Sequence, residues 1–156
     1  MFGKLNDKEI EEMMHHQILG RIGCHADGVT YVVPISYVYD GVYVYGHTFE
    51  GMKINLLRKN PKVCFQVDST KNLANWESVI GWGEFEELQD PELCKEALQK
   101  LNERKLPVIH SKTMQISSLW PFTDEDDEKL GIFFRIKLGD KTGRFERGSD
   151  EYFFAT

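Results

Sequence analysis

Hydrophobic and polar positions along the chain change period several times, and each change predicts the start of a new element. Asn6 is followed three residues later by Glu9, which is the spacing of a helix capping box. Ile10, Met13 and Met14 then recur at helical spacing. The N-terminal segment is therefore predicted to form a short amphipathic helix.

Three β-rich runs follow this helix, at residues 18–25, 29–39 and 42–48. They are separated by Asp27-Gly28 and Asp40-Gly41, and an Asp-Gly pair supplies the positive φ angles that a tight hairpin turn requires. The pattern predicts a three-stranded antiparallel meander.

Pro34 lies inside the longest of these runs, although proline cannot donate to a strand ladder. Its position indicates an edge strand, a bulge, or backbone that faces a ligand. A second helix is predicted over residues 51–60, ending where Asn60-Pro61 disfavours helical dihedral angles. Residues 62–68 and 76–88 have the pattern of a fourth and a fifth strand, the latter bending at its two glycines.

The C-terminal part of the chain begins with Asp90-Pro91, which predicts a third helix with proline at its first position. One face of that helix is apolar and consists of Leu93, Ala97, Leu98 and Leu101. Residues 131–138, 142–147 and 151–155 are predicted to be closing strands, and residues 106–129 favour neither helix nor strand.

Together these elements predict the fold class. At least six strands with mostly hairpin connections, and only three short helices, indicate a mainly β protein built as a closed or nearly closed antiparallel barrel. The 156 residues match the usual size of one domain, so a single domain over residues 1–156 is expected. Such a small barrel fills its interior with side chains, so a sizeable ligand is expected on its outside or at a subunit interface.

Composition and charge narrow the classes of function. A net charge of −6 argues against a general nucleic-acid or membrane-surface binder, because both need a basic face. No apolar run approaches the roughly 20 residues that cross a bilayer. The N-terminus is polar and acidic, unlike a signal peptide. Three widely spaced cysteines favour reduced core thiols, and the expected location is the cytoplasm.

Lys53 is the residue whose position is hardest to explain by packing alone. At about 100° per residue it falls inside the apolar arc of the helix at residues 51–60, between Leu56 and Leu57. Met52 and Ile54 complete that arc. A lysine there can simply lay its stem along apolar surface and extend its ammonium group to water. In the first turn of a helix, however, the free N–H groups and the helix dipole also favour an anion.

The residues before Lys53 make phosphate the anion to consider. His47 and Thr48 offer side-chain donors, and Gly51 lets backbone approach a ligand closely. The alternative assigns Thr48 to helix capping, His47 to strand packing and Gly51 to the turn. Residue chemistry alone leaves both interpretations open.

A longer pattern contains these residues. The order VVPISYVYDGVYVYGHTFEGMKINLLRKNPKVCFQVD followed by WESVIGWGEFEEL resembles the FMN-binding split barrel of the pyridoxamine 5′-phosphate oxidase-like superfamily. Within it, the chain resembles the nitroimidazole-resistance-protein-like flavoproteins. The resemblance extends from about residue 18 to residue 101 and more weakly to the end. It implies an antiparallel split β-barrel, FMN as the cofactor, and a homodimer with two FMN sites at the subunit interface.

The resemblance also implies roles for the positions that match. His47, Thr48 and Lys53 would contact the FMN phosphate, with Gly51 permitting close approach. The remaining implied contacts are to the flavin ring, some of them from the partner subunit: Val33, Pro34, Ile35, Ser36, Ser78 and Val79. Arg21 would add positive charge. Trp120 is a candidate for stacking on an aromatic ring, and its alternative is an ordinary core or interface tryptophan.

Other chemistry is less well supported by the sequence. His15 and His16 diverge on a helix, and Cys24 and His25 point to opposite faces of a strand, so neither pair predicts a zinc site. His47 stays open as an axial ligand of haem, since some split-barrel relatives bind haem. No nucleophile elbow is present. The ending GRFERGSDEYFFAT only loosely resembles the arginine- and proline-containing segment of the vitamin-synthesising oxidases, which argues against pyridoxal phosphate synthesis.

The function that the resemblance implies is that of an FMN-dependent oxidoreductase. Electrons would pass from a reduced nicotinamide to a small acceptor such as a nitroaromatic, a quinone-like compound or another flavin. The absence of an evident acid–base pair agrees with this, because a flavin carries the redox chemistry itself. The alternatives are a non-enzymatic flavin or haem binding module for storage or sensing, and a purely structural dimer without cofactor.

Overall fold

The computed structural model describes residues 1–104 and 131–148. Their elements, in chain order, are β1 (Phe2–Lys4), α1 (Asp7–His16), β2 (Leu19–Ala26), β3 (Val29–Ser36), β4 (Val38–Tyr39), β5 (Tyr43–Thr48), α2 (Met52–Lys59), β6 (Lys62–Asn72), β7 (Asn75–Leu88), α3 (Pro91–Glu103) and β8 (Ile132–Arg147). The predicted strand at residues 151–155, residues 106–129 and Trp120 all lie outside the described residues.

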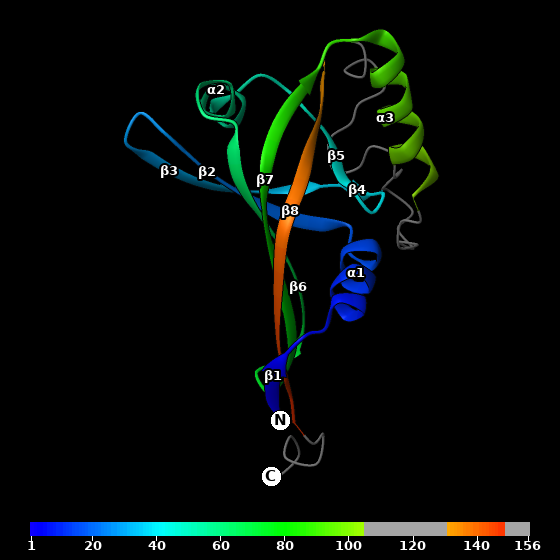
Figure 1. The fold of residues 1–156 in the computed structure, drawn as a ribbon. Helices are drawn as coiled ribbons and strands as arrows, with labels where there is room; N and C mark the ends of the chain where they lie inside the picture. Colours follow the sequence, from blue (N-terminus) through cyan, green and yellow to red (C-terminus); the bar gives the residue numbers. More distant parts are fainter. Residues whose placement is uncertain (105–130, 149–156) are drawn as a thin grey trace, which may run out of the picture.

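Eight strands form one antiparallel sheet with the order β3-β2-β6-β7-β8-β5-β4, and β1 pairs with β8 (Figure 1). The sheet curls into a barrel. The barrel is split, because β3 and β4 at the two ends of the order are not hydrogen-bonded to each other in the described part of the chain. The prediction of a mainly β, antiparallel split barrel is therefore confirmed.

The prediction of a continuous three-stranded meander is wrong. The turn at Asp27-Gly28 joins β2 and β3 as predicted, with φ angles of 52° and 74°. The run at residues 29–39, however, breaks at Tyr37, so that β4 pairs with β5 at the opposite end of the strand order. The local pattern identifies each hairpin, but it carries no information about which longer strands lie between them.

Two further corrections concern the strand list. The predicted strands at 131–138 and 142–147 are one continuous strand, β8, which pairs with β7 over nearly its whole length. The register of that pairing shifts between Gly81 and Gly83, which is the irregularity expected from the two glycines of β7. A Cβ atom at Gly83 would lie 2.1 Å from the Lys137 carbonyl oxygen, so only glycine permits this close approach. The short strand β1 was not predicted.

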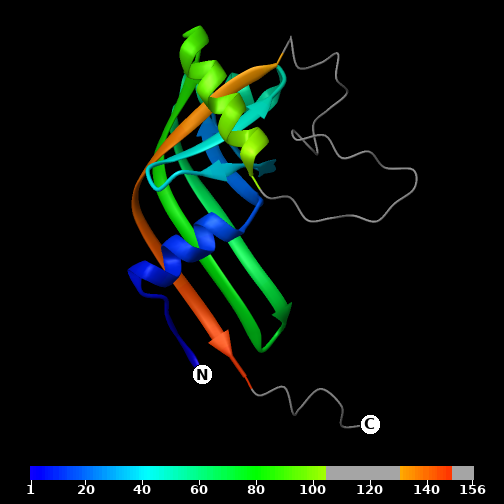
Figure 2. The same ribbon diagram turned by 90° about the vertical axis from the view of Figure 1, so that its right-hand side faces the viewer.

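The helices follow their caps. The Asn6 side chain accepts a hydrogen bond from the Glu9 N–H at 2.9 Å, and Asp90 accepts one from the Glu92 N–H at 2.9 Å. In Figure 2, α1 and α3 both lie on the side of the sheet that faces the viewer. The Ala97 side chain of α3 packs with Tyr45 of β5, which fixes α3 over the outer face of that strand.

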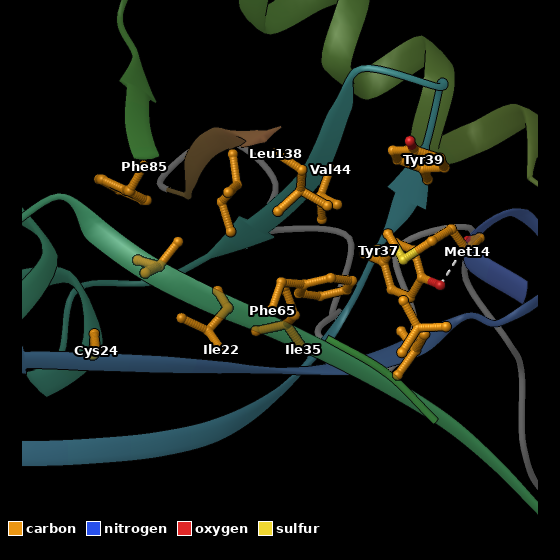
Figure 3. Close-up of a cluster of buried hydrophobic side chains, with 14 of the residues drawn as sticks. Met14, Ile22, Cys24, Ile35, Tyr37, Tyr39, Val44, Phe65, Phe85 and Leu138 are labelled. Carbon is orange, nitrogen blue, oxygen red and sulfur yellow. Dashed lines mark hydrogen bonds between the residues drawn. The ribbon is translucent and has the colours of Figure 1, made fainter. Parts of the chain in front are cut away.

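The core fills the barrel, as predicted for one of this size. Figure 3 shows side chains of β2, β3 and β6 facing those of β5, β7 and β8 across the interior. Ile22, Phe65 and Val44 are completely buried there. Tyr37 closes one end, and its hydroxyl donates to the Met14 carbonyl at 2.7 Å. No helix in the described part of the chain is long and apolar enough to cross a membrane.

Candidate functional site

Strand β3 borders the open side of the barrel and bears the predicted flavin-ring positions 33–36. Hydrogen-bonded and non-hydrogen-bonded pairs alternate along an antiparallel ladder. Counted from the two-residue turn at Asp27-Gly28, the pair Arg21–Pro34 is non-hydrogen-bonded. The absence of an N–H on Pro34 therefore removes no hydrogen bond from the ladder. Of the three interpretations of Pro34, the structure confirms a position in an edge strand. The same alternation points the backbone N–H and C=O of Val32 and Ser36 toward the open edge.

The four side chains of this segment do not share one surface. Ile35 is buried in the barrel core, and Val33 lies on the same face of the strand. Pro34 is exposed on the outer face, whereas Ser36 on that face is covered. The segment therefore offers a ligand its edge backbone and the Pro34 ring rather than four side chains. Contact of all four with a flavin stays a prediction.

Helix α2 begins in an unfilled environment. Its N-cap, Gly51, has extended backbone with φ 173°, and no side chain caps the helix. No acidic residue stands in the first turn. A Cβ atom added at Gly51 would meet no atom of the described residues within 4 Å, so these residues leave space beside the first N–H groups. This helix start retains the free donors and the positive end of the dipole that an anion requires.

Lys53 lies in that first turn and is partly buried, in agreement with its predicted inward direction. Burial lowers the pKa of its ammonium group, and the nearby Cys24 thiol of β2 opposes that shift. The predicted apolar arc needs one correction: Ile54, Leu56 and Leu57 are buried, but Met52 is 57% exposed. Met52 stands at the first position of the helix, where no neighbouring element of the described chain covers it.

The other two cations of α2 have carboxylate partners. Arg58 bonds Glu50 and Glu87, each at 2.8 Å, and Lys59 pairs with Asp27. Glu50, the acidic residue closest to Lys53 in sequence, is therefore directed to Arg58. Among the described residues Lys53 forms no ion pair, so its charge is available to an anion at the helix start.

His47 and Thr48 are successive residues of β5, so their side chains leave opposite faces of the strand. His47 is 3% exposed, and its ring packs 4.6 Å from that of Phe133 and 5.5 Å from that of Phe49. Neither ring nitrogen has a hydrogen-bond partner within the described part of the chain, and burial lowers the pKa of the imidazole. A Cβ atom at Gly131 would lie 1.7 Å from Nε2. His47 is therefore a neutral, enclosed imidazole with unused hydrogen-bonding capacity.

Ser78 and Val79 lie in β7, whose backbone is paired on both sides by β6 and β8. Val79 belongs to the core, and the Ser78 hydroxyl on the other face accepts a hydrogen bond from Gln66 at 3.0 Å. Two strands separate β7 from β3, a distance of about 14 Å at the usual strand spacing. One subunit therefore does not bring Ser78 to the β3 edge, and its predicted contact depends on the partner.

The outer face near Ser78 carries a polar network. Arg21 donates to Asp68 at 2.7 Å and to Gln66 at 3.2 Å. The charge of Arg21 is thus balanced within the subunit, unlike that of Lys53. Among the described residues, no group of three or more histidine, cysteine, aspartate or glutamate side chains is placed to hold a metal ion.

Two features of this region were not singled out from the sequence. Arg104, directly after α3, reaches back to Ser36, and its only local signal is a basic residue at a helix end. On the outer face, an open, mostly apolar groove of about 410 Å³ contains Val32, Cys64 and Trp82 among its lining residues. Trp82 is 48% exposed there, whereas Trp76 donates to Glu146 at 3.1 Å.

The fold and the site described above agree with the similarity of this chain to known proteins. Residues 6–144 match the family model described as pyridoxamine 5′-phosphate oxidase. The chain belongs to this family and, by its fold, to the FMN-binding split-barrel superfamily. The resemblance seen in the sequence is confirmed at this level.

Individual relatives make the similarity more specific. An uncharacterized protein of Rhizobium meliloti (strain 1021) is 29% identical over 127 residues, which cover 81% of this chain and 83% of the relative. The crystal structure of an FAD-binding protein from Mesorhizobium loti has a TM-score of 0.70 and 28% identity, covering 93% of this chain and 98% of its own. A candidate 5-nitroimidazole antibiotic resistance protein from Bacteroides thetaiotaomicron, at 20% identity, shares the fold with a TM-score of 0.68 over 93% of this chain and 87% of its own.

Proposed function

We propose that this protein binds FMN and works as an oxidoreductase that passes electrons from a reduced nicotinamide to a small acceptor such as a nitroaromatic. One observation carries the proposal: Lys53 has no acidic partner among the described residues and stands at a helix start with free donors and open space. Lys53 lies near Cys24 of β2, which pairs with Tyr31 of β3, and the backbone groups of Val32 and Ser36 in β3 point toward the open edge. A phosphate group and a polar, planar ring are the two parts of a ligand that this donor set fits.

In this proposal, different residues bind the phosphate and the ring of FMN. The ammonium group of Lys53 and the first N–H groups of α2 would hold the phosphate, and the β3 edge would hydrogen-bond the polar side of the ring. The neutral imidazole of His47 would donate one hydrogen bond rather than a charge. The bound flavin supplies the redox chemistry, and the protein supplies orientation and exclusion of water.

The homodimer is part of the proposal. Val32, Trp82 and Leu19 are 63%, 48% and 45% exposed on the outer face of the sheet, and exposed apolar patches of this kind mark interaction sites. A partner on this face would cover Trp82 and bring a second subunit near Ser78. Light scattering of the purified protein measures this directly, with twice the chain mass expected and a monomer opposing the proposal.

The test of the cofactor is the visible spectrum of the purified protein, followed by release and identification of the bound flavin. Two flavin absorption bands and released FMN support the proposal. Release of FAD instead would show that the cofactor is the larger nucleotide and would contradict the assignment of FMN. Bleaching on anaerobic addition of NADH or NADPH, reversed by a nitroaromatic, supports the oxidoreductase. A bound flavin that neither reductant touches supports a storage or sensing module instead.

A second candidate, haem binding, is favoured by one observation. Residues 1–104 and 131–148 offer neither ring nitrogen of His47 a hydrogen-bond partner, and a buried neutral imidazole is a common axial ligand of haem iron. A Soret band that disappears in His47→Ala would support this candidate. It leaves the charge of Lys53 unexplained, which is why FMN is preferred.

A further inference from the structure

Arg104 connects the end of α3 to the edge strand of the barrel. Its Nη1 donates to the Ser36 hydroxyl and, at 3.3 Å, to the carbonyl of Tyr37. Tyr37 itself is 1% exposed and anchored on α1 through the hydroxyl bond to Met14. The guanidinium group is thus bound to a rigid corner of the fold, at the point where β3 ends.

The charge of this guanidinium group persists in its partly buried position. Burial lowers the pKa of Arg104 to about 10, which still leaves the group protonated at neutral pH. A cation that has lost part of its hydration acts more strongly on neighbouring charges than one in bulk water. Arg104 is therefore an electrostatic feature of the site and does more than close the helix end.

Ser36, which accepts a hydrogen bond from Arg104, lies at the open edge of the barrel. Ser36 is one of the β3 residues whose backbone N–H and C=O face the open edge, as the ladder alternation shows. The family resemblance implies contact of Ser36 with the flavin ring, and the structure shows that the Ser36 hydroxyl accepts a hydrogen bond from Arg104. The cation is consequently fixed next to the strip of backbone on which the polar side of the ring would lie.

We propose that Arg104 is a positioning residue that raises the reduction potential of the flavin bound at this edge. The inference rests on the proposed function. A reduced flavin carries more negative charge at the polar side of its ring than the oxidised form, so a fixed cation there stabilises the reduced form more. Charge near that part of the ring is a principal way in which a protein tunes a flavin.

The experiment is a measurement of the midpoint potential of the FMN-loaded protein, together with the Kd for oxidised FMN. Arg104→Gln is expected to weaken binding of the reduced flavin about tenfold relative to the oxidised flavin, which lowers the potential of this two-electron couple by about 30 mV. Binding of oxidised FMN should change much less. Arg104→Lys, which keeps the charge, should restore most of the potential.

Arg135→Gln is the matched control, because it removes one arginine charge from β8, which three strands separate from β3 in the strand order. Its potential should equal that of the wild type. Equal potentials for wild type and Arg104→Gln, or an equal fall in Arg135→Gln, overturn the inference while leaving FMN binding intact. A wild-type protein that takes up no FMN overturns the proposed function and the inference together.

A second variant covers the case in which Arg104→Gln does not fold. Ser36→Ala keeps the arginine and removes the hydroxyl that holds it, so a smaller fall in potential in the same direction is expected. An unchanged potential in Ser36→Ala would show that the guanidinium group held by this hydroxyl does not act on the flavin.

Discussion

Replacing Lys53 by alanine is the most direct perturbation of the proposed site. The change removes one partly buried ammonium group from a helix start that has no acidic residue and no capping side chain. A hydrogen bond to a charged group contributes about 1.5–3 kcal/mol. At about 1.4 kcal/mol per factor of ten, FMN affinity should fall by roughly 10- to 150-fold. Because the group is partly buried, moderate salt should screen the effect only weakly.

The assay is titration of the apoprotein with FMN, read by calorimetry or by flavin fluorescence, and repeated with riboflavin. Riboflavin lacks the phosphate, so its affinity should be almost the same in wild type and Lys53→Ala. Lys59→Ala is the matched control on the same helix, because its ammonium group pairs with Asp27 on the hairpin. Two results would refute the reasoning: an equal loss of affinity in the Lys59 variant, or an equal loss for riboflavin.

Five further variants test the fold and the site. Asn6→Ala should destabilise the protein by about 1 kcal/mol in urea denaturation, because α1 loses its cap, and an unchanged midpoint would contradict the cap. Gly83→Ala should cost about 1–3 kcal/mol through its contact with a backbone carbonyl, whereas Gly51→Ala, which meets open space, should leave stability unchanged and weaken FMN binding. Burial lowers the pKa of His47 in the folded protein below the ordinary value of about 6.5 that it has when unfolded. Its stabilisation is therefore complete above that pH and is lost as the pH falls below it, by up to about 1.4 kcal/mol per pH unit. His47→Phe should flatten this dependence between pH 7.5 and 5, and a profile unchanged from wild type would contradict a neutral imidazole. Trp82→Glu should convert a dimer to a monomer in light scattering and weaken FMN binding with it, and a dimer that persists would place the interface elsewhere.

The local elements were predictable because their signals act over a few residues. The Asp27-Gly28 turn, the Asn6 cap and the Asp90-Pro91 helix start each depend on neighbours in the chain, and all three are confirmed. Strand order was not predictable in the same way. The meander failed at Tyr37, where β3 ends and the chain passes to β4. The β4–β5 hairpin is local, but β5 also pairs with β8, about ninety positions away, and no local signal indicates that pairing.

In the candidate site, too, the features that depend on neighbouring residues were predictable and those that depend on tertiary contacts were not. The inward direction of Lys53 followed from helical periodicity, but the exposure of Met52 did not, because nothing local says where the covering surface ends. That Lys53 has no acidic partner in the described chain also depends on tertiary contacts. Glu50 is three residues from Lys53, yet its carboxylate is held by Arg58, which Glu87 of β7 binds as well.

By itself, the sequence determined the three helices, the hairpin turns and most of the strand segments, and that a lysine points inward at a helix start. Periodicity, capping and turn chemistry are properties of neighbouring residues, and they act before the chain is folded. Only the tertiary structure decided which strand borders the open side, that Lys53 has no acidic partner among the described residues, and that Arg104 reaches Ser36. Those outcomes come from competition among charges and backbone groups that are distant in sequence and meet only when the sheet has closed around its core.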